Sequence, residues 1–108
     1  MGMLELFKEI WNEREHRSEI SGRPLLPAGH FLWHFQLSHI LTKGNYGRYK
    51  FQKFNIVLML PEEHTFWENF TDRDKEKSMY LAHKEKWDAL FELEEQLKQR
   101  YHRESKQR

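Results

Sequence analysis

The pattern of hydrophobic and polar residues predicts a helix at the start of the chain. Large apolar side chains recur there at three- and four-residue spacing, separated by charged and polar ones: Leu4, Phe7, Ile10 and Trp11. This is the period of an amphipathic helix, so we expect residues 3–16 to form a short helix that covers one side of a core. The stretch that follows, "SGRPLLPAGH", contains two glycines and two prolines and is expected to be a loop.

The middle of the chain predicts a hairpin followed by a helix. The segment "HFLWHFQLSHIL" is rich in aromatic and aliphatic residues, which favours a strand that ends near Ser38 or His39. "TKGNYGRYKFQK" then forms a loop, in which glycines allow tight turns. "FNIVLML" has the apolar, β-branched character of a buried strand, and Pro61 ends it. The next segment, "PEEHTFWENF", begins a helix with proline and two glutamates in its first turn.

The last third of the chain is highly charged and predicts one long helix. From Asp72 onward, aromatic and aliphatic residues recur at roughly helical spacing and lead to the basic tail "YHRESKQR". We therefore expect an amphipathic helix over about 72–104. The predicted fold class is α+β, in a single domain over 1–108 whose core spans about 17–70. The N-terminal and C-terminal helices pack on that core.

Composition limits the function classes. The 108 residues include 18 Lys and Arg against 17 Asp and Glu, so a net charge of +1 predicts no strong overall attraction to nucleic acid or membranes. There is no cysteine, which excludes disulfides, a thiol nucleophile and zinc held by cysteine. No apolar run is long enough for a membrane span, and the first residues lack a signal-peptide pattern. We expect a soluble, cytoplasmic protein.

Three residues stand out by their positions in this plan. His39 ends the first strand, Asn55 lies in the second strand, and His64 lies in the first turn of the following helix. If the strands pair and the helix folds across them, all three converge at one end. This arrangement resembles the HNH endonucleases and their ββα-metal fold over about residues 17–69, and it suggests a small phage or bacterial member. "SEISGRPLL", "FQLSHILTKGNYGRY" and "FNIVLMLPEEH" carry the resemblance.

The resemblance implies a role for each of these positions. His39 falls where the family has its general base, for which a neutral imidazole is suited because its pKa lies near working pH. Asn55 falls where the family's asparagine either orients that histidine or helps to hold the metal. His64 falls on a metal-ligand position, and Glu68, one turn later on the same helix face, occupies the place where many members have a second metal ligand. The implied cofactor is one divalent cation, Mg²⁺ or Mn²⁺ first, with Zn²⁺ or Ni²⁺ as alternatives.

The chain also departs from the family. Ser38 precedes the base histidine, where many members have an acidic or histidine ligand, so its neutral hydroxyl is a weaker metal-ligand candidate. Many members hold a structural zinc through two pairs of cysteines. The positions that align with them here are Ser18, Ser21, Leu60 and Glu63. We therefore expect no structural zinc, and expect apolar packing from the terminal helices to stabilise the hairpin instead.

One long window of the chain lacks acids. From Ile20 to Pro61 there is no Asp or Glu, whereas five basic residues are present: Arg23, Lys43, Arg48, Lys50 and Lys53. Such a local excess of positive charge predicts binding to the phosphates of DNA, duplex or branched. Tyr46 and Tyr49 could add sugar or base contacts. Together with this window, the resemblance implies a metal-dependent DNA endonuclease or nickase that hydrolyses phosphodiester bonds.

Other interpretations remain open. The alternative from another class is an HNH scaffold that has lost catalysis and acts as a nucleic-acid-binding or inhibitory protein. The C-terminal helix could also mediate homodimerisation or docking, which is compatible with either function. His30 and His34 are a rival metal pair, although four-residue spacing suits a helix better than the strand expected there.

Overall fold

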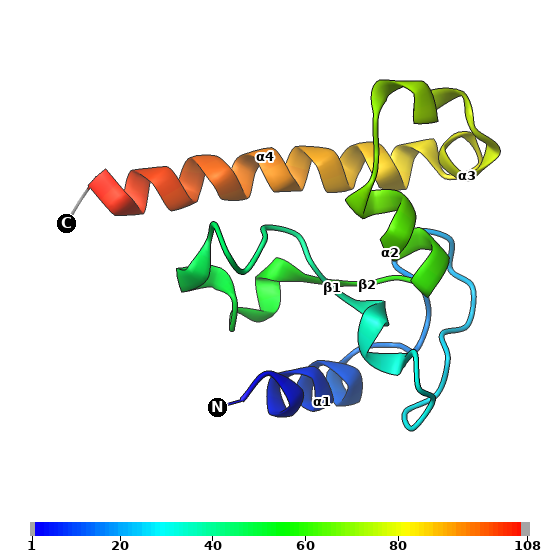
Figure 1. Ribbon diagram of the computed structural model, residues 1–108, viewed down its shortest axis with the longest axis horizontal. Coiled ribbons are helices and arrows are strands. Elements are labelled where there is room, and N and C mark those ends of the chain that lie inside the picture. Colours follow the sequence, from blue (N-terminus) through cyan, green and yellow to red (C-terminus); the bar gives the residue numbers. More distant parts are fainter. Residues whose placement is uncertain (1, 107–108) are drawn as a thin grey trace.

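A short antiparallel hairpin forms the middle layer of the molecule, with helices on both sides (Figure 1). The computed structural model describes residues 2–106. Its strands are β1 (Leu37–His39) and β2 (Ile56–Leu58), and its helices are α1 (Met3–Glu13), α2 (Pro61–Glu68), α3 (Ser78–Leu81) and α4 (Lys84–Lys106). The predicted α+β class is confirmed. Among the described residues, none of the helices combines the length and hydrophobicity needed to cross a membrane.

The hairpin separates two hydrophobic clusters. Successive side chains of a strand point to opposite faces, and in β2 and its continuation Ile56 and Leu58 join one cluster while Val57 and Met59 join the other. The first cluster contains the buried face of α1, and the second contains the aromatic face of α4. Figure 1 shows α1 and α4 on opposite sides of the hairpin accordingly. Both terminal helices therefore cover the core, as the sequence predicts.

The first helix is confirmed, but it ends earlier than the predicted residue 16. Ile10 and Trp11 are buried as expected, whereas Leu4 is 56% exposed and Leu6 takes its place in the core. α1 ends at Glu13 because Arg14 is extended. The Arg14 guanidinium donates hydrogen bonds to backbone carbonyls of the hairpin, at Ile56 (2.7 Å) and at residue 53 (2.9 Å).

Both predicted strands are shorter than expected. Residues 33–36 form a 3₁₀ helix, so the strand prediction is wrong there, and only residues 37–39 pair with β2. Gln36 explains the turn, because its buried side-chain amide binds both the N–H (2.7 Å) and the carbonyl (3.0 Å) of Leu26. Asn55 ends another 3₁₀ turn (Lys53–Asn55) directly before β2 and does not lie within the strand. His39 ends β1, as predicted, opposite Ile56.

The predicted single helix from Asp72 is also wrong in its first part. A 3₁₀ turn (Asp72–Glu76) and α3 precede α4, which begins at Lys84. The buried Asp74 carboxylate accepts a hydrogen bond from the Thr71 N–H at 2.7 Å and so caps the start of this turn. Trp87 is fully buried, and its indole N–H donates to the Met79 carbonyl at 3.0 Å. The chain therefore bends around Trp87 before the long helix begins.

Candidate active site

A cleft of about 710 Å³ lies at the end of β1, between the hairpin, α2 and α4. It brings together most of the predicted chemistry, because two histidines, a glutamate and a lysine from the predicted site line it: His39, His64, Glu68 and Lys43. His34, Phe35 and Glu94 are also part of the wall. Ser38 and Asn55 are fully buried behind this surface. The cleft is therefore our candidate active site.

The position of His39 is fixed through one ring nitrogen. Its Nε2 lies 2.9 Å from the backbone carbonyl of Lys50. A carbonyl only accepts hydrogen bonds, so Nε2 carries the proton and the lone pair of a neutral ring is on Nδ1. Burial lowers the pKa of His39 most strongly, the hydrogen bond to Lys50 opposes this, and the charges of Lys43 and His64 lower the pKa further. His39 is consequently neutral at pH 7 and can accept a proton.

His64, in the first turn of α2, is held at both ring nitrogens. The Ser38 hydroxyl lies 2.5 Å from Nδ1, and the Glu68 carboxylate lies 2.9 Å from Nε2. A carboxylate only accepts, so Nε2 carries a proton when it contacts Glu68. The Ser38 hydroxyl can either donate or accept, and it therefore suits both neutral tautomers of His64. If a cation replaced the proton on Nε2, the contact between Nδ1 and the Ser38 hydroxyl would remain.

The pair formed by His64 and Glu68 has the dimensions of a shared cation site. Two neighbouring ligand atoms about 2.1 Å from an octahedral ion lie about 3 Å apart, close to the 2.9 Å between Nε2 and Oε1. Ser38 contacts the opposite nitrogen of the ring, an arrangement that suits orientation of the His64 imidazole.

A third protein ligand is not in place. Within residues 2–106, no three His, Cys, Asp or Glu side chains gather around a point where they could hold a metal ion. Two protein ligands are sufficient for Mg²⁺ or Mn²⁺ when water and substrate phosphate complete the shell. In the rival pair, His34 lines the cleft, whereas Nδ1 of His30 accepts a hydrogen bond from the Leu32 N–H at 3.0 Å.

Asn55 ties the two ends of the hairpin loop together. Its Oδ1 accepts from the N–H of Leu41 (2.8 Å), and its Nδ2 donates to the carbonyls of Leu41 (3.0 Å) and Tyr49 (3.3 Å). Lys50, whose carbonyl binds His39, is the next residue after Tyr49. Of the two roles that the resemblance implies for Asn55, this geometry favours orientation of the histidine over contact with a metal.

The acid-free window receives acids from other elements. Arg23 is paired with Glu62 of α2 at 2.8 Å. Lys53 is paired with Glu13 at 2.6 Å and Glu9 at 3.3 Å, both from α1, and these contacts raise the pKa of Lys53. Two of the five predicted DNA-binding cations are therefore neutralised within the molecule.

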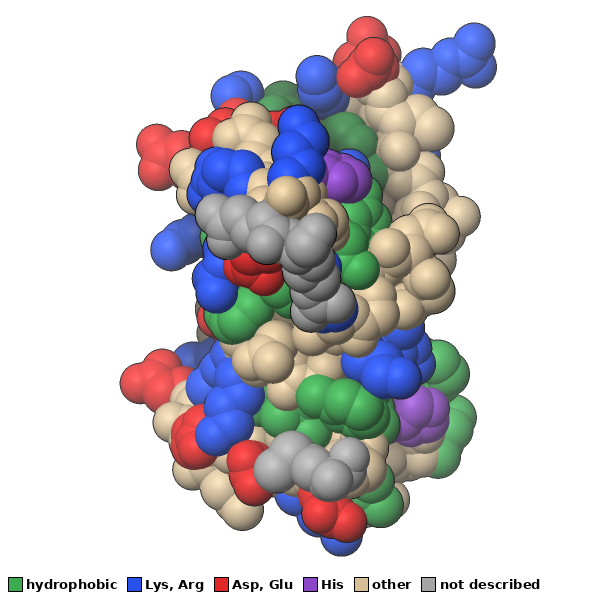
Figure 2. All heavy atoms as spheres, turned by 90° about the vertical axis from the view of Figure 1, so that its left-hand side faces the viewer, with side chains coloured by type: hydrophobic (Ala, Val, Ile, Leu, Met, Phe, Trp, Pro, Cys, Tyr) green, Lys and Arg blue, Asp and Glu red, His purple; other side chains and the backbone are tan. Residues whose placement is uncertain are grey.

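The other three basic residues differ from one another. Arg48 turns inward and donates to the Tyr101 carbonyl at 2.7 Å. Lys43 lines the cleft, and Lys50 is exposed beside the Phe51 ring. Figure 2 shows the face that carries both chain ends, on which basic side chains are interspersed with acidic and hydrophobic ones. Lys43 and Lys50 are thus the predicted cations best placed to meet phosphate.

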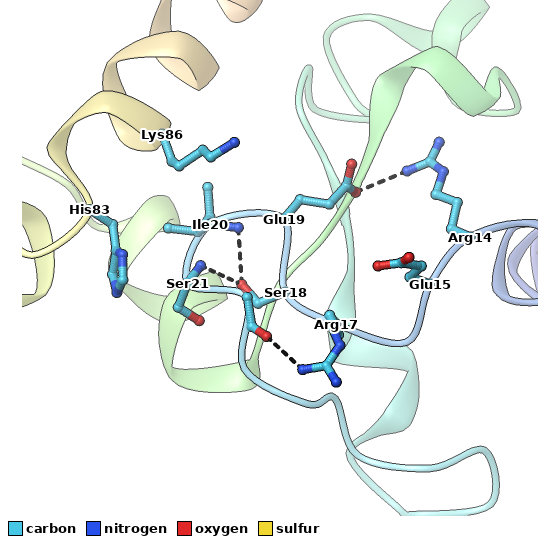
Figure 3. Close-up of a pocket in the computed structure, with 10 residues that line it drawn as sticks. Arg14, Glu15, Arg17, Ser18, Glu19, Ile20, Ser21, His83 and Lys86 are labelled. Carbon is cyan, nitrogen blue, oxygen red and sulfur yellow. Dashed lines mark hydrogen bonds and ion pairs between the residues drawn. The ribbon is translucent and has the colours of Figure 1, made fainter.

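A polar clamp joins residues 18–26 (SEISGRPLL), here called the knuckle, to the start of α2. The buried Ser18 hydroxyl accepts hydrogen bonds from the N–H groups of Ile20 and Ser21, both at 3.1 Å (Figure 3). It donates to the Glu63 carboxylate at 2.6 Å, which also accepts from the Leu60 N–H at 2.7 Å. The clamp joins the knuckle to α2 by hydrogen bonds, in addition to the apolar packing that the sequence predicts.

The knuckle also forms one side of a second cleft, of about 730 Å³. Figure 3 shows Arg14 and Arg17 on the knuckle side and His83 and Lys86 on the side of α4. Arg14 is paired with Glu19 at 3.1 Å, and Arg17 donates to the Gly22 carbonyl at 3.2 Å. Of the predicted catalytic and metal residues, His39, His64 and Glu68 line the other cleft.

Sequence reasoning missed two features of the candidate active site. Phe35 is 45% exposed on the cleft wall, with its ring centroid 6.5 Å from that of His64. Glu94 reaches the cleft from α4, and burial raises its pKa. The helical period identifies the face of α4 that packs inward, but no local signal shows that Glu94 lines the same cleft as His39. No protein-family model, curated protein or solved structure matches this chain.

Proposed function

We propose that this protein is a metal-dependent DNA endonuclease or nickase of the HNH type. The observation that carries the proposal is the juxtaposition in one cleft of a neutral His39, with Nδ1 available, and the His64–Glu68 pair. A divalent cation held by that pair would supply Lewis-acid stabilisation of the negative charge that develops during phosphodiester hydrolysis. His39 acts as general base.

His39 is suited to take a proton from the attacking water. Its Nε2–H group is fixed on the Lys50 carbonyl, so the ring presents Nδ1 in a constant direction. When Nδ1 accepts the proton, the same carbonyl stabilises the imidazolium through the existing hydrogen bond. Burial keeps the resting ring neutral, because it lowers the pKa of His39.

A cleavage assay tests the proposal directly. The purified chain is incubated with supercoiled plasmid and with a four-way DNA junction in Mg²⁺, Mn²⁺, Zn²⁺ or Ni²⁺, with EDTA as control. We expect nicked or linear plasmid, or cut junction strands, with at least one metal and none in EDTA. Absence of cleavage with every metal contradicts the proposal.

His64→Ala should weaken binding of Mn²⁺ by at least about tenfold, because it removes one of two protein ligands. Calorimetry and the electron paramagnetic resonance signal of free Mn²⁺ measure this change. Glu68→Gln should weaken binding in the same way. Glu62→Gln is the matched control on the same helix, since Glu62 is paired with Arg23 outside the cleft. Unchanged Mn²⁺ affinity in His64→Ala contradicts the assignment and favours the scaffold alternative.

Lys43→Ala should weaken DNA binding and reduce the dependence of log K on log salt by about one unit, because one phosphate contact is lost. Fluorescence anisotropy in EDTA, over a series of salt concentrations, measures both quantities. Arg23→Ala is the control, because Glu62 already neutralises Arg23. If Lys43→Ala and Arg23→Ala lose the same DNA affinity, the ion pair of Arg23 with Glu62 does not keep Arg23 from binding DNA. The whole acid-free window then binds DNA.

The second candidate function is a scaffold that binds nucleic acid, or inhibits, without catalysis. Two observations favour it: Ser38 in place of the acidic or histidine ligand found in many HNH members, and the engagement of Arg23, Arg48 and Lys53 within the molecule. Such a protein would bind DNA without a requirement for metal. Homodimerisation or docking through α4 is compatible with both functions, and sedimentation tests it.

A further inference from the structure

The C-terminal turns of α4 contact the loop of the hairpin, residues 40–55. Figure 1 shows α4 passing over this loop near the end of the chain. Arg48 donates to the Tyr101 carbonyl at 2.7 Å, and its guanidinium lies 3.9 Å from the centroid of the Tyr101 ring. The Tyr49 hydroxyl donates to the Glu104 carboxylate at 2.8 Å, and Arg100 binds the same oxygen at 2.9 Å.

Aromatic packing supports these polar contacts. Tyr49 is 3% exposed, and its ring lies 5.0 Å from those of Tyr101 and Phe54, close to perpendicular in both cases. Tyr46 meets the Tyr101 ring at 4.9 Å. Edge-to-face pairs of this kind add specific geometry to the burial of apolar area. The loop is therefore held against α4 by several independent contacts within a few residues.

The loop segment that contacts α4 directly precedes the residue that binds His39. Lys50 follows Tyr49, and the Lys50 carbonyl is the hydrogen-bond partner of His39 Nε2. Asn55 binds the Tyr49 carbonyl from the other side. β1 has only three residues, so the strand pairing alone gives the ring little support. The contacts from α4 are thus made by the two residues that directly precede Lys50.

We propose that the last turns of α4 are a positioning element for His39, through Tyr101 and Glu104. They hold residues 48–50 so that the Lys50 carbonyl keeps the proton of His39 on Nε2 and leaves Nδ1 available. A catalytic role for this positioning, which we call the brace, rests on the proposed function. The effect of Tyr101 and Glu104 on the tautomer of the His39 ring does not depend on that function. Tyr101 and Glu104 do not line the cleft.

Nuclear magnetic resonance of the full chain tests the brace without reference to cleavage. The ¹⁵N shifts of the His39 ring report the tautomer, and a titration reports its pKa. In Tyr101→Ala and Glu104→Ala we expect a mixture of tautomers and a pKa that moves away from its wild-type value. Tyr101→Phe keeps the ring and the backbone carbonyl, so it should restore the wild-type spectrum. Arg103→Ala, which alters an exposed residue between these two, is the matched control and should change nothing.

Tyr49→Phe provides a milder variant in case the alanine variants unfold. It removes only the hydroxyl bound to Glu104, keeps the buried ring, and should shift the His39 tautomer in the same direction. An unchanged His39 spectrum in all folded variants overturns the proposal.

Cleavage kinetics give the second readout. If the proposed function holds, kcat falls about tenfold or more in Tyr101→Ala, because small displacements of a catalytic group are costly. KM for DNA should change less than kcat, since Lys43, the phosphate-binding candidate in the cleft, lies outside residues 48–50. If the wild type does not cleave DNA, the proposed function is wrong. The ¹⁵N shifts of the His39 ring still show whether Tyr101 and Glu104 position that ring.

Discussion

His39→Ala should abolish DNA cleavage and leave the fold in place. Removal of a general base typically lowers the rate by about 10²–10⁴-fold, and His39 is the residue whose Nδ1 is free to take the proton of water in the cleft. The side chain is half-buried at the end of β1 and belongs to neither hydrophobic cluster, so its loss removes little of the core. Initial rates of plasmid nicking measure the effect, and circular dichroism with thermal unfolding measures the fold.

His34→Ala is the matched control, because His34 lines the same cleft and lies outside the proposed mechanism. It should cleave at close to the wild-type rate. Cleavage by His39→Ala at an undiminished rate would show that another group is the base. A loss in both variants would point to substrate binding by the cleft wall.

The same residue sets the expected dependence on pH. Because burial lowers the pKa of His39 below 6.5, cleavage should rise with pH through that lowered value and be level at neutral pH. The unfolded state binds more protons than the folded state between the folded pKa and 6.5. The free energy of unfolding therefore increases as pH rises through this window and decreases as pH falls. The contribution of His39 to the pH dependence of the unfolding free energy should be absent in the His39→Ala variant.

Asn55→Ala should cause the largest loss of stability among the site variants. Three buried backbone groups lose their partner, the N–H and carbonyl of Leu41 and the carbonyl of Tyr49. Each unsatisfied buried group costs about 1–3 kcal/mol, so we expect about 3 kcal/mol or more in the free energy of unfolding. This is a large share of the 5–15 kcal/mol typical of a domain. Urea denaturation measures the change.

Asn55→Asp sharpens the same test. It keeps the acceptor for Leu41 but places a second carboxylate oxygen against the two carbonyls that Nδ2 binds, so it should destabilise at neutral pH and recover partly on protonation. Asn69→Ala is the control, because the Asn69 amide binds the Thr65 carbonyl on the exposed end of α2. Its effect should stay within about 0.5 kcal/mol. Wild-type stability in Asn55→Ala would mean that the loop holds its shape without the Asn55 hydrogen bonds.

The elements with a clear local period could be predicted from the sequence. The period of α1, the apolar run of β2 and the proline before α2 are all short-range signals. The boundaries depend on distant contacts. α1 ends where Arg14 turns to the hairpin, and Gln36 draws its segment into a 3₁₀ helix by binding Leu26. Such contacts have no local signature, so the ends of elements were the weakest part of the prediction.

The candidate site shows the same division. The spacing of His39, His64 and Glu68 predicted residues that now line one cleft. The partners that decide their state could not be predicted, because the acceptor for His39 is a backbone carbonyl. The pairing of Arg23 with α2 and of Lys53 with α1 could not be predicted either. It joins positions far apart in the chain and reverses the simple expectation from local charge.

The two hydrophobic clusters on either side of β2 have a consequence for how the sequence selects one strand alignment. Both faces of β2 are apolar, so a shift by one residue would still bury hydrophobic side chains on both sides, and hydrophobicity alone cannot reject it. The polar residues Asn55 and Glu63 lie just before and just after this segment, each buried and each satisfied by specific partners. A shifted strand would leave those partners unpaired. The two buried polar groups thus act against misaligned states and specify the fold as well as stabilising it.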